Sequence, residues 1–267
     1  MNIEKPILGE RAKPPSDRAA LRRYVRIFYD LQRIRLQVGG RNRAQKIELH
    51  EIDLARLAAR EAELRKVERD ALHDVEECLR RFPFYTNVLK GRYRGLGPTM
   101  AGVIMAEFDV EKATTVSKMW AFAGLHTEID PKNPELRRAP RPRRGEKLPY
   151  NAWLRTKLVG VLAECLIKAK SPVTKFYYDY KHRKATAGWG KSDGHRHNAA
   201  KRYMIKMLLA DLWAAWREFA GLPIRLTYHE EYQGHIHGAG PAVESAPLDG
   251  ELSDEVDAEM ELLEGAA

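Results

Sequence analysis

The chain has 267 residues, a formal net charge of +9 and a sequence pI near 9.5, and 44% of its residues are hydrophobic. Such a chain can bury the core of one large domain or two small ones. Two cysteines far apart, Cys78 and Cys165, exclude a disulfide framework and a cysteine-rich zinc site. The sequence shows neither a signal peptide nor an uncharged run of the ~20 residues that a membrane span needs. We therefore expect a cytoplasmic protein with no membrane contact.

The charge is distributed unevenly along the chain. Residues 240–267 hold nine acidic residues and no Lys or Arg. This leaves 46 basic against 28 acidic residues, a net charge of +18, on residues 1–239. A body this basic attracts phosphate polymers and releases their counterions on binding, whereas a solvated basic surface would only aid solubility. We interpret it as a nucleic-acid-binding body that precedes a disordered acidic tail.

The N-terminal third is predicted to be a helical arm. Residues 1–15 contain three prolines and no periodic pattern, which indicates a flexible N-terminal arm. Within 16–83, one helix starts after Ser16 or Asp17 and ends at Gly39-Gly40, and a second runs from about Asn42 to Arg81. The second helix has small and apolar residues at intervals of seven: Leu57, Leu64, Ala71 and Cys78. This spacing favours a dimerising coiled coil, and the alternative is a helical hairpin packed within one subunit.

The rest of the chain is also predicted to be helical. Residues 84–223 show helical patterns near 97–108, 114–124, 149–169, 172–187 and 195–220. Residues 224–239 form a short extension, in which 224–237 has the pattern of one strand. We predict an all-α fold: a long helical or coiled-coil arm followed by a compact helical nucleic-acid-binding domain.

The most specific local pattern is YRGLGPTMAGVI at residues 93–104. A Gly-apolar-Gly turn before small and apolar residues is typical of a helix-hairpin-helix, in which N–H groups at a helix N-terminus hold a phosphate oxygen. Ala101 and Gly102 are small where the two helices would approach. The alternative is an ordinary corner between helices. The phosphate contacts are predicted from Arg92, Arg94, Gly95, Gly97 and Thr99.

A second basic feature is the loop at residues 133–148, in which five arginines fall within eight residues. Its prolines keep the segment extended, so that the guanidinium groups can follow a phosphate backbone. A solvated linker is the alternative, but arginine is the residue that binds phosphate with two parallel hydrogen bonds. The predicted contacts are Arg137, Arg138, Arg141, Arg143, Arg144 and Lys147.

A third feature is the alternation of aromatic and basic residues within 171–213. Rings beside cations suit stacking on single-stranded bases, although about half of these rings must be core at helical spacing. In the last helix, Met204, Leu208, Leu212 and Trp216 are predicted to be core, and Lys201, Arg202 and Lys206 to lie on the solvated face. The predicted nucleic-acid contacts of the last three helices are Arg155, Lys175, Tyr177, Tyr180, Lys181, Arg183, Lys184, His197, Lys201 and Arg202.

Catalytic patterns are weak. The segment His195-Arg196-His197-Asn198 partly matches an HNH nuclease but lacks its flanking strands and second metal ligands. Residues 229–237 include three histidines beside two glutamates, and such groups lie more often in a polar surface loop than around a metal. No nucleophile and base form a recognisable pair. We predict no catalytic residue, no metal site and no cofactor.

Five sequence blocks in residues 84–220 resemble, in the same order, the C-terminal domain of bridge-RNA-guided insertion-sequence transposases. The helical arm is similar to the coiled coil of those enzymes. The match covers about half of the chain, and about three-quarters with the arm. The blocks are GLGPTMAGVIMAEF (95–108), KMWAFAGL (118–125), RRGEKLPYNAWLRTKLVGVLAECL (143–166), SPVTKFYYDYKHR (171–183) and HNAAKRYMIKMLLADLWAAW (197–216).

Two differences from the transposases indicate that the chain resembles a related family more closely. The chain begins almost directly at the arm, where those enzymes have a RuvC-like domain, and after Ala123-Gly124-Leu125 no serine precedes Ser171, where they carry a nucleophilic serine. The chain is therefore more similar to the Tas proteins of tandem interspaced guide RNA systems. Their core is similar to the Nop domain of box C/D ribonucleoproteins, and some lack a nuclease domain.

The resemblance to Tas proteins implies a homodimer in a prokaryotic or phage-infected cell. It would bind a guide RNA and direct it to target DNA without cutting, with a separate nuclease or host factor as a further partner. Two alternatives remain open. One is a diverged or truncated transposase with catalytic residues that the sequence does not reveal. The other is a guide-independent helix-hairpin-helix protein that binds duplex DNA.

Overall fold

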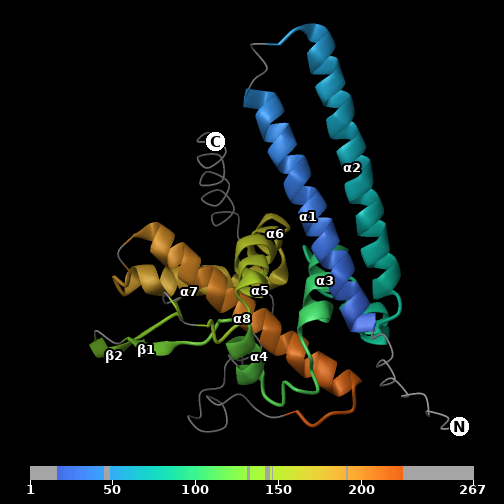
Figure 1. Cartoon of the computed structure of the whole chain (residues 1–267). Coiled ribbons are helices and arrows are strands. Elements are labelled where there is room, and N and C mark those ends of the chain that lie inside the picture. The colour runs from blue at the N-terminus through green and yellow to red at the C-terminus, as the bar shows by residue number, and fades with distance from the viewer. Residues whose placement is uncertain are drawn as a thin grey trace, which may run out of the picture. The chain divides into compact units, whose positions relative to one another are not determined.

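The computed structural model describes residues 17–44, 49–130, 133–141, 145, 147–190 and 192–224. Three predicted features lie outside these residues: the N-terminal arm at 1–15, the histidines at 229–237 and the acidic tail. The chain divides into two units, residues 1–224 and 225–267. The described part of the first unit has eight α-helices, short π and 3₁₀ turns and one two-stranded hairpin, so the fold is all-α as predicted (Figure 1).

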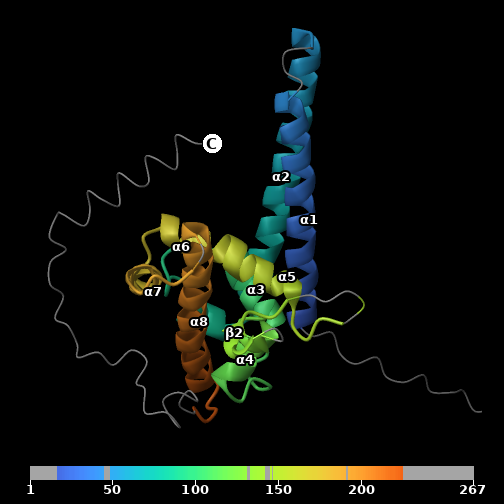
Figure 2. The ribbon, with the colours of Figure 1, turned by 90° about the vertical axis from the view of Figure 1, so that its left-hand side faces the viewer.

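The helical arm consists of α1 (Asp17–Ala44) and α2 (Glu51–Leu79), which lie side by side and antiparallel (Figures 1 and 2). Near the start of α1, apolar residues one turn apart are buried against the other helices. The C-terminal part of α1 and the N-terminal part of α2 extend beyond the remaining described helices (Figure 2). The buried residues of α1 include Leu21, Val25 and Phe28.

The predicted end of the first helix at Gly39-Gly40 is wrong, because α1 continues to Ala44. The second helix starts at Glu51, later than expected. Gly39 is buried, and a Cβ at this position would lie 3.1 Å from Oε1 of Glu61 on α2. The close approach of the two helices therefore outweighs the low helix propensity of glycine.

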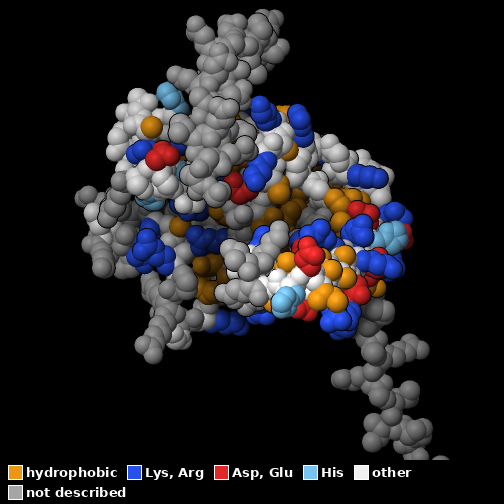
Figure 3. All heavy atoms as spheres, turned by 90° about the horizontal axis from the view of Figure 1, so that it is seen from above, with side chains coloured by type: hydrophobic (Ala, Val, Ile, Leu, Met, Phe, Trp, Pro, Cys, Tyr) orange, Lys and Arg blue, Asp and Glu red, His pale blue; other side chains and the backbone are white. Residues whose placement is uncertain are grey.

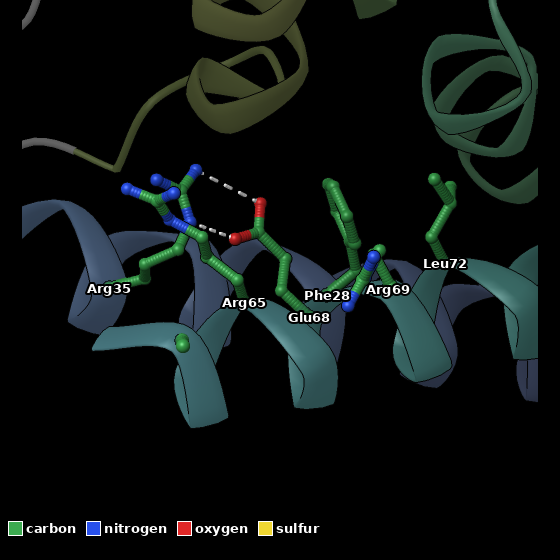
Figure 4. Close-up of a pocket in the computed structure, with 7 residues that line it drawn as sticks. Phe28, Arg35, Arg65, Glu68, Arg69 and Leu72 are labelled. Carbon is green, nitrogen blue, oxygen red and sulfur yellow. Dashed lines mark hydrogen bonds and ion pairs between the residues drawn. The ribbon is translucent and has the colours of Figure 1, made fainter. Parts of the chain in front are cut away.

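The residues spaced by sevens on α2 pack within the chain. Ala71 and Cys78 are buried in the core, and Leu57 and Leu64 are partly buried. Glu68, which precedes Ala71 by one turn, is buried and binds the guanidinium of Arg35 on α1 (Figure 4). The arm is therefore a helical hairpin within one subunit, and a coiled coil between two subunits stays a prediction.

The central helix is α3 (Pro98–Glu107), in which every residue from Met100 to Glu107 is buried. It packs at the base of the arm against both arm helices. A Cβ on Gly102 would lie 2.9 Å from Cγ1 of Val75 and 3.0 Å from Cγ2 of Val25. The small residue was expected between the two helices of a helix-hairpin-helix, but it serves the contact between α3 and the arm.

The remaining helices are α4 (Val116–Phe122), α5 (Ala152–Lys157), α6 (Ala163–Lys168), α7 (Lys175–Thr186) and α8 (Asp193–Phe219). A π-helix (Leu158–Leu162) joins α5 to α6, and another (Tyr85–Leu89) follows α2. In α8, the four residues predicted as core are buried, because they recur every four residues on one face: Met204, Leu208, Leu212 and Trp216.

One hairpin of strands was not predicted. β1 (Glu128–Asp130) pairs antiparallel with β2 (Asn133–Arg138), with Glu128 opposite Arg138. The first half of the arginine-rich loop is therefore a strand. This half of the loop is extended, as predicted. Pairing with β1 keeps it extended, and Pro140 and Pro142 come after the strand in the sequence.

Substitutions at two helical glycines should have opposite effects on the free energy of unfolding. A Cβ on Gly40 would meet no heavy atom within 4 Å, so Gly40→Ala should raise the free energy of unfolding by roughly 0.5–1 kcal/mol through helix propensity. Gly102→Val should lower it by roughly 1–3 kcal/mol, because the added side chain overlaps Val75 and Val25. Urea unfolding measures both. Equal effects of the two changes would contradict the packing of α3 against the arm.

Candidate nucleic-acid interface

The Gly-apolar-Gly turn is mainly a packing element. The guanidinium of Arg92 binds the Asp211 carboxylate on α8, with Nη2 3.1 Å from Oδ1, and the Tyr93 hydroxyl donates to the same carboxylate. Gly95 has φ of +90°, and a Cβ there would lie 2.7 Å from the carbonyl oxygen of Cys165. Both residues hold the turn against α6 and α8, which argues against the predicted phosphate contacts of Arg92 and Gly95.

The start of α3 is open next to this turn. Gly97 is the N-cap residue and has nothing within 4 Å of the position of a Cβ, and Thr99 is partly exposed. Arg94 is exposed and has no hydrogen bond or ion pair with any described residue. A phosphate contact at these three residues stays a prediction.

The first half of the arginine-rich loop is held by contacts within the chain. Arg138 binds Glu128 across the hairpin, with Nε 3.2 Å from Oε1. Arg155 on α5 donates from Nη1 to the carbonyl of Pro140 at 2.9 Å and to the Tyr150 hydroxyl at 3.2 Å. The ion pair with Glu128 argues against the predicted role of Arg138 as a phosphate ligand. Arg141 and Lys147 are exposed, whereas Arg143, Arg144 and the side chain of Arg137 lie outside the described residues.

The aromatic residues of α7 divide into core and surface. Tyr177 is 6% exposed, and its hydroxyl lies 2.6 Å from Nδ1 of His197. The prediction that Tyr177 stacks on a base is therefore wrong, because its ring is core. Tyr180, three residues later, is partly exposed and stacks on Tyr203 of α8, with ring centroids 4.7 Å apart.

A buried polar network occupies the core side of α8. Lys201, which was placed on the solvated face, is only 8% exposed and donates to Oε1 of Glu164 at 2.6 Å. His197 lies 3.8 Å from the same carboxylate, and burial followed by the charge of Lys201 lowers the pKa of His197. Lys181 binds Asp193 at 3.3 Å. These three residues stabilise the contacts of α8 with its neighbours, which argues against their predicted role as nucleic-acid ligands.

Two other cations of α8 lack an acidic partner among the described residues. Arg202 and Lys206 are four residues apart, so they share one face of the helix. Neither forms a hydrogen bond or ion pair through its side chain with any described residue. Burial lowers the pKa of both side chains, and for Arg202 the charge of Arg155 lowers it further. The ammonium of Lys206 lies 4.3 Å from the ring centroid of Trp120.

We call Arg155, Arg202 and Lys206, together with the stacked rings of Tyr180 and Tyr203, the basic cluster. Its residues come from α5, α7 and α8. Three acids of these helices and of α6 bind elsewhere: Glu164 binds Lys201, Asp193 binds Lys181, and Asp211 binds Arg92. The two other acids, Asp179 and Glu218, form no ion pair with the cluster. The cluster therefore carries partly desolvated positive charge that no described carboxylate neutralises, and this is the environment of an anion-binding site.

Further rings and cations continue along α7 from the basic cluster. The Arg183 guanidinium and the Lys184 ammonium each lie 5.5 Å from the ring centroid of Tyr180. Lys184 also lies 4.9 Å from the ring of Trp189, which is 38% exposed. Lys175 at the start of α7 is exposed. Repeated pairs of a ring and a cation are the chemistry of single-stranded nucleic-acid binding.

Basic side chains are not confined to one part of the described surface (Figure 3). In the view from above the arm, Lys and Arg side chains lie on several parts of the described surface, with hydrophobic side chains between them (Figure 3). Sequence reasoning missed Lys206, Tyr203 and Trp120 as members of the interface. The four-residue spacing of Lys206 from Arg202 was the available signal.

A metal centre is not formed by the residues that the structure describes. Among them, no group of three or more His, Cys, Asp or Glu side chains is placed to hold a metal ion. His195 of the HNH-like segment stacks on Trp189, with centroids 4.9 Å apart. The possible ligands at 229–237 lie outside the described residues.

None of the helices in the described ranges is long and apolar enough to cross a membrane. The chain matches no protein-family model, no curated protein and no solved structure.

Proposed function

We propose that this protein binds a guide RNA at the basic cluster and directs it to DNA without cutting, as a homodimer. The observation that supports RNA binding most directly is the pair Arg202 and Lys206, two partly buried cations with no acidic partner among the described residues. Burial of an unpaired charge costs free energy of folding, and a bound anion would offset that cost. A nucleic-acid phosphate is an anion of suitable chemistry.

Single-stranded RNA fits the basic cluster better than a small anion or a duplex. A small anion needs two or three donors, whereas here the cations extend from Arg155 across α8 to Arg183 and Lys184. The rings of Tyr180 and Trp189 lie among them and are partly exposed. Bases of a duplex are stacked on one another, so their faces are free for aromatic rings only in single strands, loops and bulges.

The guide and DNA-targeting parts of the proposal rest on the resemblance to Tas proteins. The five resembling blocks fall on α3, on α4, on α5 and α6, on α7 and on α8, and three of these helices, α5, α7 and α8, carry the basic cluster. Exposed apolar side chains on the arm are compatible with a second copy as partner: Ile27 is 50%, Ile34 43% and Ile52 62% exposed. A separate nuclease or host factor would supply any cleavage.

The experiment is to purify the full chain from cells that carry its native locus and to sequence the RNA that copurifies. We expect one or a few discrete short RNAs. The variant Arg202→Gln/Lys206→Gln should yield the same amount of protein with much less RNA. A heterogeneous mixture of host RNA, retained equally by wild type and variant, would contradict the proposal.

Two further measurements distinguish the alternative functions. Tight binding of RNA-free protein to duplex DNA, lost in Arg94→Gln but kept in the Arg202→Gln/Lys206→Gln variant, would favour a DNA-binding protein that uses the open start of α3. Nicking of supercoiled DNA in Mg²⁺ with the copurified RNA, lost on changing a single carboxylate, would favour a transposase-like enzyme.

A further inference from the structure

A pocket of about 520 Å³ lies where the arm meets α5, on the side of α5 that faces α1. We call it the junction pocket. It is lined from α5 by Trp153 and Lys157 and from α1 by Tyr29, Asp30, Gln32, Arg33, Leu36 and Gln37. None of these residues belongs to the basic cluster, and none was predicted as a binding residue from the sequence. The one acid among them, Asp30, is bound to Arg33.

Lys157, the last residue of α5, is the central charge of the junction pocket. Its ammonium lies 3.3 Å from the ring centroid of Tyr29 and 5.6 Å from that of Trp153. It forms no hydrogen bond or ion pair with any described residue. Burial lowers the pKa of Lys157, and the neighbouring charge of Arg26 lowers it further. The two rings hold this ammonium in place while its N–H groups lack an acceptor among the described residues.

The walls around Lys157 are held by contacts from three helices. Trp153 packs edge-on against Tyr29, with ring centroids 5.8 Å apart. The guanidinium of Arg26 lies 3.4 Å from the centroid of Trp153 and donates to Oε1 of Glu107 on α3 at 3.0 Å. Burial raises the pKa of the Tyr29 hydroxyl to about 12, so this ring stays neutral near pH 7. The pocket is therefore a formed site in which Lys157 has a fixed position.

The chemistry of the junction pocket selects an anion. Cations already cover a face of each ring, so neither ring offers a free pair of faces for a base. Arg33 at the rim adds donors, and its bond to Asp30 at 3.0 Å joins two side chains that are 67% and 65% exposed, so solvent weakens it. Lys157 and Arg33 line the same pocket, and a phosphate has several oxygens with which to accept hydrogen bonds from both.

Nucleic acid is the source of phosphate that the position favours. Lys157 and Arg155 are two residues apart on α5, and Arg155 belongs to the basic cluster. Residues two apart on a helix point to different sides, so α5 presents one cation to α8 and the other to the arm. We propose that the junction pocket binds a backbone phosphate of the strand held at the basic cluster, so that this strand continues past α5 onto the arm. This proposal rests on the proposed function.

The test compares the full-length wild type with Lys157→Gln, Lys157→Arg and Lys66→Gln. Lys66 is an exposed lysine of α2 without a described partner, so it controls for the loss of one charge. The probes are single-stranded uridine oligomers of increasing length. Short oligomers that fill only the basic cluster should bind wild type and Lys157→Gln equally. Above a threshold length Lys157→Gln should bind more weakly, and Lys157→Arg should restore binding.

Salt dependence gives a second readout with these longer oligomers. Loss of one phosphate contact should lower the slope of log affinity against log salt by about 0.7, so the advantage of wild type over Lys157→Gln should shrink roughly 2.6-fold between about 50 and 200 mM salt. Lys66→Gln should keep the slope of the wild type. Lys157→Gln should unfold at the same temperature as wild type or a higher one.

The outcomes separate the two proposals. If Lys157→Gln binds every oligomer as wild type does while Arg202→Gln/Lys206→Gln loses binding, the junction pocket is not a phosphate site and the basic cluster stands. If Lys157→Gln weakens oligomers of all lengths equally and also lowers the unfolding temperature, the lysine is structural and the proposal is wrong. If the wild type binds no oligomer, both proposals fail together.

Discussion

Replacing Arg202 and Lys206 together with glutamine should weaken the binding of single-stranded RNA by roughly 3–6 kcal/mol at moderate salt, from two charge-assisted hydrogen bonds. Both cations lie on one face of α8 without an acidic partner among the described residues, so their hydrogen bonds are available to phosphates. The salt slope should fall by about 1.4, at ~0.7 per single-strand phosphate. A filter-binding or anisotropy titration at several salt concentrations measures both quantities.

The same variant should keep or gain stability, which distinguishes a binding role from a structural one. Burial lowers the pKa of both side chains, so keeping them charged costs free energy of folding. Removing those charges relieves that cost. A lower unfolding temperature would show that Arg202 and Lys206 hold the fold, and loss of RNA binding would then say nothing about direct contact.

A matched control removes two positive charges from the arm. Arg56 and Lys66 are exposed on α2, and Arg56 has only a distant ion pair, 3.9 Å from Asp53. Arg56→Gln/Lys66→Gln changes the net charge by the same amount as the α8 variant. If both double variants lose RNA affinity equally, binding follows the overall charge and not the basic cluster.

Helices were predictable from this sequence because their apolar residues recur with the helical period. The predicted helix at 195–220 is found as α8, Asp193–Phe219, and its buried face is the predicted one. The failure at Gly39-Gly40 has a tertiary cause. Glycine lowers helix propensity locally, but the approach of Glu61 from the neighbouring helix requires a small residue there. Helix propensity depends on the residues of one segment, whereas this contact joins two helices.

The site was less predictable, because a sequence does not show which charges are already paired. Arg92 looked available beside its turn, yet its partner Asp211 is 119 residues away along the chain. Lys201 and Lys206 looked alike on one helix, but the first binds Glu164 and the second has no described acid. Tyr177 and Tyr180 differ by less than one helical turn, and only one is core. Tertiary packing decides each of these cases.

Glu107 is the acid whose loss should most affect the joint between arm and body. It is the one charged residue in the run Met100–Glu107 and is 8% exposed. Its Oε1 accepts a hydrogen bond from Arg26 of α1 at 3.0 Å, and its Oε2 accepts one from Asn151 at 2.7 Å. Asn151 in turn caps α5, because its Oδ1 accepts from the backbone N–H of Leu154. One carboxylate therefore links α1, α3 and the start of α5.

Glu107→Ala should lower the free energy of unfolding by roughly 2–4 kcal/mol. Removal of one partner from a buried ion pair costs about 3–5 kcal/mol, and the value is reduced here because Arg22 and Arg26 remain 47% and 39% exposed to solvent. Glu111→Ala is the control, since Glu111 is exposed four residues later and should change stability by less than about 0.5 kcal/mol. Urea unfolding of both variants measures the difference.

Because Glu107 also fixes Arg26 against Trp153, binding of the longer oligomers should weaken in Glu107→Ala and not in Glu111→Ala. Equal stability of the two variants would show that α1 and α5 are held together without this carboxylate.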